Sequence, residues 1–290
     1  MKKSKHKKKS KRVVLIIFLI LVIVYGTIEL WGNLTVGTTY YKITTKRLPT
    51  EFEGYKIAQI SDLHNSEFGK DNLKIIKILK DENPNIIVIT GDLVDSNHTD
   101  IDIAIKFINQ AVEIAPCYYV TGNHEAWIGN LFDELEEQLL YADVTVLHNE
   151  MITLSIGKDK INLVGLDDPD FIDRSSYIQK SIIDNHLHNM DLKDEFSILL
   201  SHRPEFYELY IKHNIDLVLS GHTHGGQFRI PFIGGVIAPN QGIFPKYDAG
   251  EHYEANTTMI VSRGIGNSII PVRINNRPEV VIVELYSQRP

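Results

Sequence analysis

The sequence has very little cysteine, and it lacks the motif of a serine hydrolase. Among 290 residues Cys117 is the single cysteine, so no disulfide can form within the chain, and this leaves the compartment of the protein open. Cys117 also lies inside an apolar run, and no Gly-x-Ser-x-Gly sequence occurs. A serine or cysteine hydrolase is therefore not supported by the sequence.

Basic residues are scarce outside the first twelve positions. Residues 1–12 hold eight of the 30 lysines and arginines and no acid, which leaves 22 basic residues to oppose all 37 acids. Residues 13–290 thus carry a formal charge of about −15. Phosphate binding along a nucleic acid needs clustered cations, so no nucleic-acid partner is expected.

Charge is also missing from residues 13–41, apart from Glu29. A basic cytoplasmic tail over 1–12 and a transmembrane signal anchor over 13–31 are predicted, because a basic run precedes an apolar one. The positive-inside rule places the rest of this single-pass protein on the extracytoplasmic side of the cell membrane. A cleaved signal peptide would look similar, but the lack of an A-x-A-like site favours an uncleaved anchor.

The remaining chain reads as a linker over 32–52, with one strand near 40–44, and a globular domain over 53–290. In this domain short apolar strands alternate with amphipathic helices, which predicts an α/β fold. Strands are expected at 56–60, 86–89, 117–120, 144–147, 151–156, 161–166, 196–200, 215–219, 259–262 and 280–285. Helices are expected at 72–83, 99–114, 131–140, 177–189 and 205–213, and Gly/Pro-rich turns at 231–245.

Five of these strands end in short polar loops that hold potential metal ligands. The loops are Asp62-Leu63-His64, Gly91-Asp92, Gly122-Asn123-His124-Glu125, His202, and Gly221-His222-Thr223-His224. In open α/β sheets ligands bind at the carboxyl ends of the strands, so we expect these loops to converge. Carboxylates, imidazoles and one amide, without thiolate, suit Mn, Fe or Zn.

Two divalent cations at such a site would explain the number of ligands. A metal pair about 3.5–4 Å apart clamps the attacking and leaving oxygens of a phosphoryl displacement and produces a hydroxide nucleophile from bound water. A bridging carboxylate is needed, and Asp92 after its loop glycine is the natural bridge. Taken singly, Asp62, Asp92 and Asn123 also fit ordinary turns or caps, and His202 fits a helix start before Arg203-Pro204. If all five loops were ordinary turns or caps, five such coincidences at strand ends would be required.

The five blocks, in this order over roughly residues 55–225, resemble the calcineurin-like metallophosphoesterase superfamily. The resemblance implies a two-sheet β-sandwich flanked by helices. It also implies that one metal is held by Asp62, His64, Asp92 and His224, and the other by Asp92, Asn123, His202 and His222. His124 would face the substrate and stabilise charge or protonate the leaving oxygen. The Gly-His-Thr-His-Gly-Gly-Gln form and the apolar N-terminus resemble the bacterial membrane-anchored or exported branch, in which one member type cleaves a lipid-linked nucleotide pyrophosphate.

Other polar residues have less specific interpretations. Glu125 is expected to support its loop as a hydrogen-bond acceptor, and Asp167 and Asp168 to shape a turn at Pro169. Arg203, Arg263 and Arg273 could grip phosphate, although a solvated salt bridge is the commoner role for such an arginine. Seven histidines have no partner block and are expected to be surface or structural residues: His6, His98, His148, His186, His188, His213 and His252.

The sequence thus predicts a catalytic domain over 53–290 that hydrolyses a phosphomonoester, phosphodiester or pyrophosphate with two divalent metal ions. The membrane tether favours a lipid-linked or envelope substrate by proximity. The competing hypothesis is a non-catalytic, metal-bound scaffold or binding domain at the membrane, since fold does not imply function. The full ligand set and the retained His124 favour the enzyme.

Overall fold

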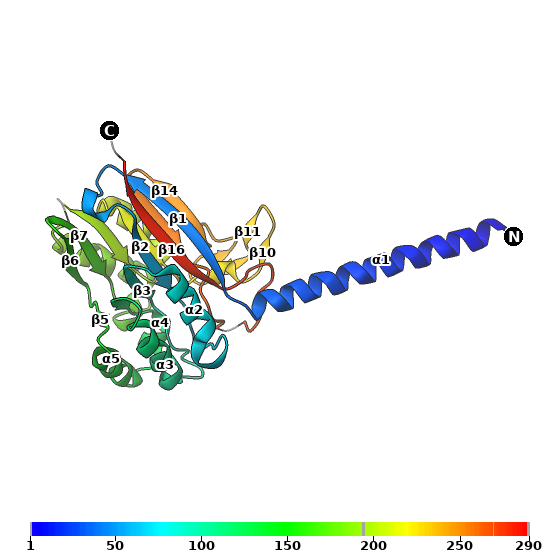
Figure 1. Cartoon of the computed structure of the whole chain (residues 1–290), viewed down its shortest axis with the longest axis horizontal. Helices are drawn as coiled ribbons and strands as arrows, with labels where there is room; N and C mark the ends of the chain where they lie inside the picture. The colour runs from blue at the N-terminus through cyan, green and yellow to red at the C-terminus, as the bar shows by residue number, and fades with distance from the viewer. Residues whose placement is uncertain (1, 193–194, 269, 289–290) are drawn as a thin grey trace.

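A long helix stands apart from the body of the protein. The computed structural model describes residues 2–192, 195–268 and 270–288. Helix α1 (Lys2–Asn33) projects from the body as a single rod (Figure 1). Its segment Lys11–Asn33 has 23 residues, and the most apolar window of that segment has a mean hydropathy of 2.9 and is not buried against the protein. At about 1.5 Å per residue it is long enough for a hydrocarbon core of about 30 Å.

The body contains two six-stranded sheets. The first sheet has the order β1-β16-β2-β3-β4-β5, and the second has the order β14-β15-β9-β8-β7-β6. The first sheet comprises β1 (Gly37–Thr45), β2 (Tyr55–Ile60), β3 (Ile86–Thr90), β4 (Cys117–Val120), β5 (Thr145–Val146) and β16 (Glu279–Ser287). The second comprises β6 (Glu150–Ile156), β7 (Asp159–Gly165), β8 (Phe196–Leu200), β9 (Leu217–Ser220), β14 (Gly250–Glu254) and β15 (Thr257–Val261).

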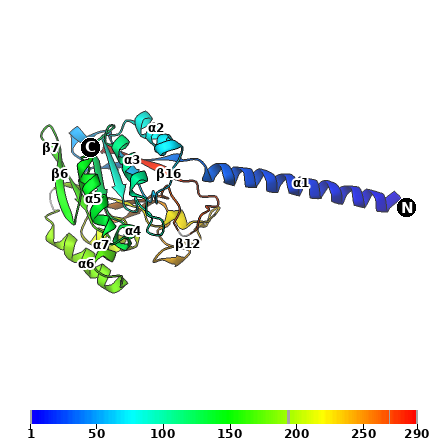
Figure 2. The same cartoon turned by 90° about the horizontal axis from the view of Figure 1, so that it is seen from below.

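The two sheets pack face to face, and helices cover their outer faces (Figures 1 and 2). Helices α2 (Leu73–Glu82), α3 (Ile101–Ala111) and α5 (Leu131–Tyr141) cover the first sheet. Helices α6 (Ser176–Asn189) and α7 (Tyr207–Lys212) cover the second. This arrangement confirms the predicted α/β sandwich flanked by helices.

The alternation of side chains along each strand explains the four layers. In β3, Ile86 and Val88 point between the sheets, whereas Ile87 and Ile89 point toward the helices. All four are buried, so the strand reads as one continuous apolar run. Burial on both faces is what such a run requires, and it stabilises the strand by about 25 cal/mol per Å² of apolar surface removed from water.

Strand direction brings the polar loops together. Strands β2, β3, β4 and β5 are parallel, and so are β7, β8, β9 and β15. The carboxyl ends of β2, β3 and β4 therefore lie at one edge of the first sheet, and those of β8 and β9 at one edge of the second. The Gln59 side chain donates a 2.9 Å hydrogen bond to the carbonyl of Ser220, so these strands lie directly opposite each other.

The strand expected near 40–44 in the linker is confirmed as β1, which pairs in parallel with β16 over its whole length. Residues 229–243 have more structure than the sequence pattern predicts, because two-residue strands there form two small antiparallel pairs. These are β10 (Arg229–Ile230) with β11 (Gly234–Gly235), and β12 (Ile237–Ala238) with β13 (Gly242–Ile243). Hydrophobic periodicity does not reveal strands this short.

Candidate metal centre

The predicted ligands come together where the two sheets meet. Asp62 follows β2, Asp92 follows β3, and His202 follows β8. Two hydrogen bonds join the sheets at this point. The His202 Nδ1 lies 2.8 Å from the carbonyl oxygen of Thr90, and the backbone N–H of His222 donates to the Asp62 carboxylate at 3.0 Å. Residues up to 160 positions apart in sequence are thus neighbours.

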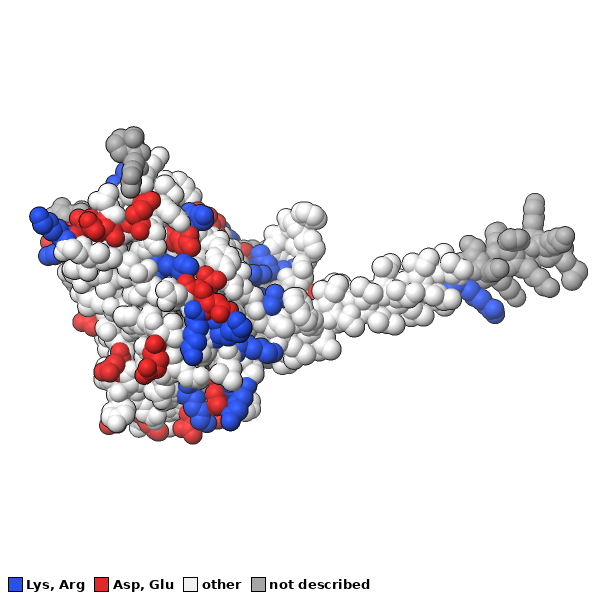
Figure 3. Space-filling view, viewed as in Figure 1, with Lys and Arg blue, Asp and Glu red and all other residues white. Residues whose placement is uncertain are grey.

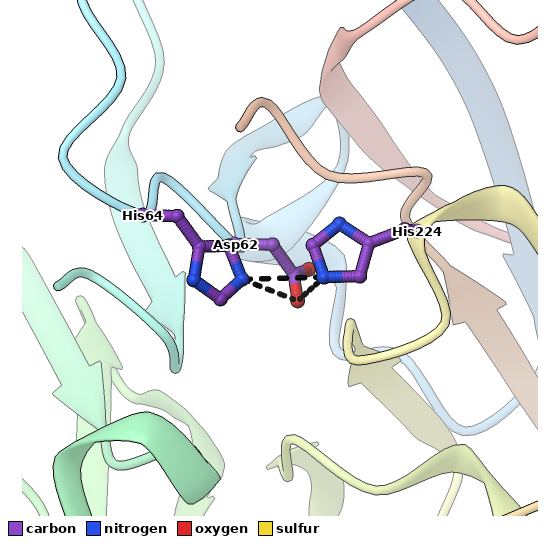
Figure 4. Close-up of side chains that lie close together, drawn as sticks. All are labelled: Asp62, His64 and His224. Atoms are coloured by element: carbon purple, nitrogen blue, oxygen red, sulfur yellow. Dashed lines mark hydrogen bonds and ion pairs between the residues drawn. The ribbon is translucent and has the colours of Figure 1, made fainter. Parts of the chain in front are cut away.

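Asp62, His64 and His224 form a first group of side chains (Figure 4). The two Nε2 atoms of His64 and His224 lie 3.2 Å apart. The Asp62 Oδ1 lies 3.7 Å from the His224 Nε2 and 4.0 Å from the His64 Nε2. All three side chains are buried.

Asp92, His202 and His222 form a second group, and Asn123 adjoins it. The Nε2 of His202 is its centre. It lies 3.2 Å from the Asp92 Oδ2, 3.2 Å from the Asn123 Oδ1 and 3.1 Å from the His222 Nδ1. Asn123 is also the first residue of helix α4 (Asn123–Trp127).

Asp92 lies between the two groups. Its Oδ2 is 3.5 Å from the His64 Nε2 of the first group and 3.2 Å from the His202 Nε2 of the second. Its Oδ1 accepts a 2.8 Å hydrogen bond from the backbone N–H of His124. One carboxylate oxygen therefore faces both sets of ligands, as the bridge in a two-cation site must.

The donor atoms fit divalent cations. Because the Nδ1 of His202 faces the Thr90 carbonyl, its proton belongs there, and the neutral ring then turns a bare Nε2 toward two oxygens with lone pairs. In the first group two ring nitrogens face each other beside a carboxylate. Lone pairs that converge in a buried site need a positive charge among them. Imidazole, carboxylate and amide donors suit Mn, Fe or Zn.

The electrostatics of the site lead to the same conclusion. Burial lowers the pKa of His202, but the charge of Asp92 and its hydrogen bond outweigh this and raise the pKa to about 10. Burial likewise raises the pKa of Asp92, yet attraction to His202 and His64 holds it well below its usual value. In the absence of a cation the His202 ring would therefore bind a proton on Nε2, so the site draws positive charge to the point where the lone pairs converge. Burial lowers the pKa of His222 and His224 well below the usual value, which keeps both rings in the neutral, metal-ligating form.

Five of the seven predicted ligands lie on strained backbone. They have positive φ angles although none is glycine: Asp62 (52°), His64 (46°), Asp92 (52°), His222 (71°) and His224 (49°). This region costs an L-residue roughly 1–2 kcal/mol. Such strain persists only where the surrounding structure enforces it, and it concentrates at functional sites.

Glu125 holds the strained loop of Asp92 in place. Its carboxylate is fully buried and accepts hydrogen bonds from the backbone N–H groups of Gly122, Asp92, Leu93 and Val94 at 2.7–3.2 Å. This confirms the prediction that Glu125 supports the loop. Burial and the nearby Asp92 charge raise the pKa of Glu125 to about 7, although the backbone donors oppose the rise.

Two glycines permit the loops to approach each other. A Cβ on Gly91 would lie 2.7 Å from the Cα of Gly122 and 2.7 Å from the His202 Nδ1. A Cβ on Gly122 would lie 2.3 Å from the Asp92 Oδ1. Any side chain at either position would therefore push Asp92 or His202 out of the site.

His124 lies outside both groups. Its Nδ1 accepts a 2.9 Å hydrogen bond from the backbone N–H of Ser96, so the proton of the neutral ring is on Nε2, which lies 3.1 Å from the Ser268 hydroxyl. Burial lowers the pKa of His124. The ring lines a cavity of about 520 Å³ together with Asp92 and His222. The lining of this cavity also includes the apolar residues Ile237, Ala238, Pro239 and Ile270.

The sequence analysis did not identify Asp95. Its Oδ2 lies 3.5 Å from the His64 Nδ1 and 3.9 Å from the His124 Nδ1, so it adjoins a ring of the first group and the ring beside the cavity. The only available signal was its position three residues after Asp92, and a lone aspartate in a loop has many ordinary roles.

The expectation of a solvated salt bridge is wrong for two arginines. Arg203 is buried, and its guanidinium makes a bidentate contact with Asp168 at 2.5 and 2.8 Å and lies 3.4 Å from the His222 Nε2. Arg273 is also buried, and its donors contact the carbonyls of Arg263 and Gly266. Asp168 also shapes the turn as expected, because its carboxylate accepts a 2.9 Å hydrogen bond from the backbone N–H of Asp170.

Comparison with known proteins agrees with this geometry. Residues 55–226 match the sequence pattern of the family described as Calcineurin-like phosphoesterase. The chain belongs to this family. It is 32% identical to the Bacillus subtilis protein YkuE, named an uncharacterized metallophosphoesterase, over 87% of this chain and 86% of that protein. The family resemblance of the five loop blocks is thereby confirmed, and the chain is a metal-dependent phosphoester hydrolase.

Two further relatives extend the comparison. The Escherichia coli protein named phosphodiesterase YaeI is 29% identical over 80% of this chain and 82% of its own length. A Bos taurus protein named transmembrane protein with metallophosphoesterase domain is 30% identical over 84% of this chain, which spans 56% of that protein. Together with the exposed apolar helix α1, relatives of this kind associate the chain with a membrane.

Proposed function

We propose that the two groups of side chains bind two divalent cations, Mn, Fe or Zn, and that the protein hydrolyses a phosphoester or pyrophosphate bond there. Asp62, His64, Asp92 and His224 would hold one cation, and Asp92, Asn123, His202 and His222 the other. The observation that carries this proposal is the position of the Asp92 Oδ2, within 3.5 Å of one ring nitrogen in each group. Bound cations of this kind polarise phosphoryl oxygens and lower the pKa of the attacking water.

The protein's own groups would supply the remaining chemistry. The proton on the His124 Nε2 is directed by the Ser96 hydrogen bond to Nδ1, and the ring lines the cavity. At that position it would protonate the leaving oxygen or stabilise charge on the phosphoryl group. The neutral ring, which burial and the Ser96 hydrogen bond favour, can donate a hydrogen bond from Nε2 to a phosphoryl oxygen, whereas protonation of the leaving oxygen would require the imidazolium form.

The lining of the cavity bears on the substrate. A lining that combines metal-centre side chains with apolar residues suits a phosphoester that carries an apolar group. The tether by α1 would raise the local concentration of a substrate borne on a membrane lipid. We therefore propose a lipid-linked or envelope phosphoester as the substrate. The positive-inside rule puts the domain on the extracytoplasmic side of a single-pass anchor over residues 13–31.

The test compares the full chain with two carboxylate-to-amide variants. Asp92→Asn changes the proposed bridge, whereas Glu136→Gln changes a carboxylate that contacts His148 at the surface at 2.6 Å. We expect Mn²⁺-stimulated hydrolysis of bis(p-nitrophenyl) phosphate by the wild type and Glu136→Gln, and its loss in Asp92→Asn. Metal content after dialysis should be two ions per chain in the first two proteins and fewer in Asp92→Asn.

Two results would contradict the proposal. One is a fully metal-loaded wild type that hydrolyses no mono-, di- or pyrophosphate ester, lipid-linked ones included. The other is unchanged metal content and turnover in Asp92→Asn, which would remove that residue from the site.

A further inference from the structure

An uncharged segment follows the last ligand block in sequence. Residues 230–244 contain no Asp, Glu, Lys or Arg, and they connect and form the short strands β10 to β13. We call them the apolar lobe. Six of these fifteen residues are large hydrophobic side chains with at least 40% of their surface exposed: Ile230, Phe232, Ile233, Ile237, Ile243 and Phe244.

Two aromatic residues of the lobe expose their rings and lie on strained backbone. Phe232 is fully exposed and has a φ of 67°, and Phe244 is 58% exposed and has a φ of 54°. Positive φ is rare for bulky residues, and exposure of an aromatic ring to water gains nothing to offset it. Contiguous exposed apolar groups of this kind mark a surface that meets a partner or a membrane.

Hydrogen bonds link the last turns of α1 to residues 273–275, and link Asn275 to Arg229, the residue before the lobe. Asn33 and Arg273 exchange two hydrogen bonds of 2.8 Å between side chain and backbone. The backbone N–H of Asn275 donates to the Glu29 carboxylate at 2.8 Å, and the Asn275 side chain donates to the carbonyl of Arg229 at 3.3 Å. Arg229 begins β10, so the lobe is fixed beside the end of α1 that enters the body.

The views of the molecule agree with these contacts. Figures 1 and 2 place β10 to β12 on the side of the body from which α1 projects. In Figure 3 the part of the surface that projects beside α1, at the end of the helix that enters the body, is white. Blue side chains lie near the base of this projection. The apolar lobe and the apolar helix therefore face the same side of the molecule.

Cations surround the base of the helix. The Arg277 guanidinium lies 4.3 Å from the centre of the Trp31 ring, and the Lys74 ammonium donates to the carbonyl of Leu34 at 3.2 Å. Trp beside Arg and Lys is typical of the membrane interface, where the ring lies at head-group level and the cations meet anionic phosphates.

We propose that the apolar lobe is a second membrane contact, which inserts Phe232, Ile233 and Phe244 into the interface of the bilayer that holds α1. The lipid surface is the favoured partner because hydrogen bonds through Asn275 hold Arg229, the residue before the lobe, beside the end of a helix that is long and apolar enough to cross a membrane. Ile237 and Ala238 of the same lobe also line the cavity of the metal centre. The contact would hold the cavity next to the membrane surface.

Quenching by spin-labelled lipid tests this contact in the full chain. Phe232→Cys, Ile233→Cys and Phe244→Cys are each labelled with an environment-sensitive fluorophore and reconstituted in nanodiscs of phosphatidylcholine and phosphatidylglycerol. Tyr141→Cys is the matched control, because Tyr141 is an aromatic residue with 92% exposure at the end of α5, away from α1 (Figure 1). Cys117 is buried, and labelling of the unsubstituted chain measures its background.

With a nitroxide on the upper acyl chain of the lipid, we expect several-fold stronger quenching at positions 232, 233 and 244 than at position 141. Equal quenching at all four positions would overturn the proposal, and so would quenching by a water-soluble nitroxide that is as strong at 232 as at 141. Hydrolysis of a soluble aryl phosphodiester, measured on each labelled protein, reports folding of the metal centre independently of this result.

Discussion

The surface cluster around His148 and the buried metal centre both combine histidine with carboxylates, and they differ in how the ring nitrogens are used. At the surface, the His148 Nε2 contacts Glu136 at 2.6 Å and its Nδ1 contacts Asp167 at 3.0 Å. Each nitrogen thus has its own partner. In the metal centre, the His202 Nε2 instead faces an aspartate, an amide and a second imidazole at once.

The difference indicates what separates a metal site from a salt bridge. The surface cluster is complete when His148 gains a proton, because two carboxylates then face two N–H donors. The centre is buried, and several lone pairs converge on the same points, so one proton cannot satisfy them. Five of the predicted metal ligands also have a left-handed backbone conformation, which is a second difference from the surface cluster. Convergence and strain, rather than the residue types alone, identify the functional cluster.

The largest expected effect comes from removal of one imidazole from each cluster. His202→Gln should lower phosphodiester hydrolysis by on the order of 10³-fold, since catalysis by bound metal supplies several kcal/mol. His148→Gln should leave turnover unchanged. Turnover with Mn²⁺ and metal content measured on both variants check this. Similar losses of turnover in His202→Gln and His148→Gln would contradict the functional distinction between the two clusters.

A change at His124 separates metal binding from proton transfer within the centre. His124→Gln should lower kcat by about 10²–10⁴-fold, the usual contribution of general acid–base catalysis, because its ring lines the cavity. Two metals per chain should remain, since His124 belongs to neither proposed ligand set. Metal analysis combined with steady-state kinetics distinguishes this outcome from simple loss of the centre.

Stability should respond most to the buried ion pair beside the centre. Asp168→Asn leaves the Arg203 guanidinium, whose side chain is 3% exposed, without its bidentate partner. Breaking a buried pair costs about 3 kcal/mol or more, although Asp170 remains 3.0 Å away. We expect a clear drop in the Tm of the full chain in detergent. Asp102→Asn, on the exposed face of α3, is the control and should not change the Tm.

The surface cluster should produce the smallest effect, visible as a pH dependence. Hydrogen bonds to Asp167 and Glu136 raise the pKa of His148 to about 9, above the unfolded value of about 6.5. The stabilisation is therefore fully present below about pH 6.5 and is lost as the pH rises through about 9. The His148 side chain is 39% exposed, so at most about 1 kcal/mol is expected.

Comparison of the wild type with His148→Gln checks this dependence. The loss of Tm between about pH 6 and about pH 10 should be greater in the wild type. A variant with the same pH profile as the wild type would show that His148 stays unprotonated in the folded protein.

Much of the fold was predictable because it depends on local patterns. The apolar run before Asp92 gave β3 to within one residue, and the amphipathic spacing at 131–140 gave α5 to within one residue. The strands β10 to β13 were not predictable, since each has two residues and depends on pairing with a neighbour. The role of β1 in the first sheet depends on β16, which lies more than 230 residues later.

The sequence alone determined which side chains are available and that each follows a strand, since these properties depend on neighbouring residues. Only the tertiary structure decided that Asp92 lies between His64 and His202, that Arg203 is buried against Asp168, and that the apolar lobe stands beside α1. The physical reason is that these contacts join segments from two packed sheets and a distant helix. Contacts between such segments depend on the face-to-face packing of the core, which no local pattern encodes.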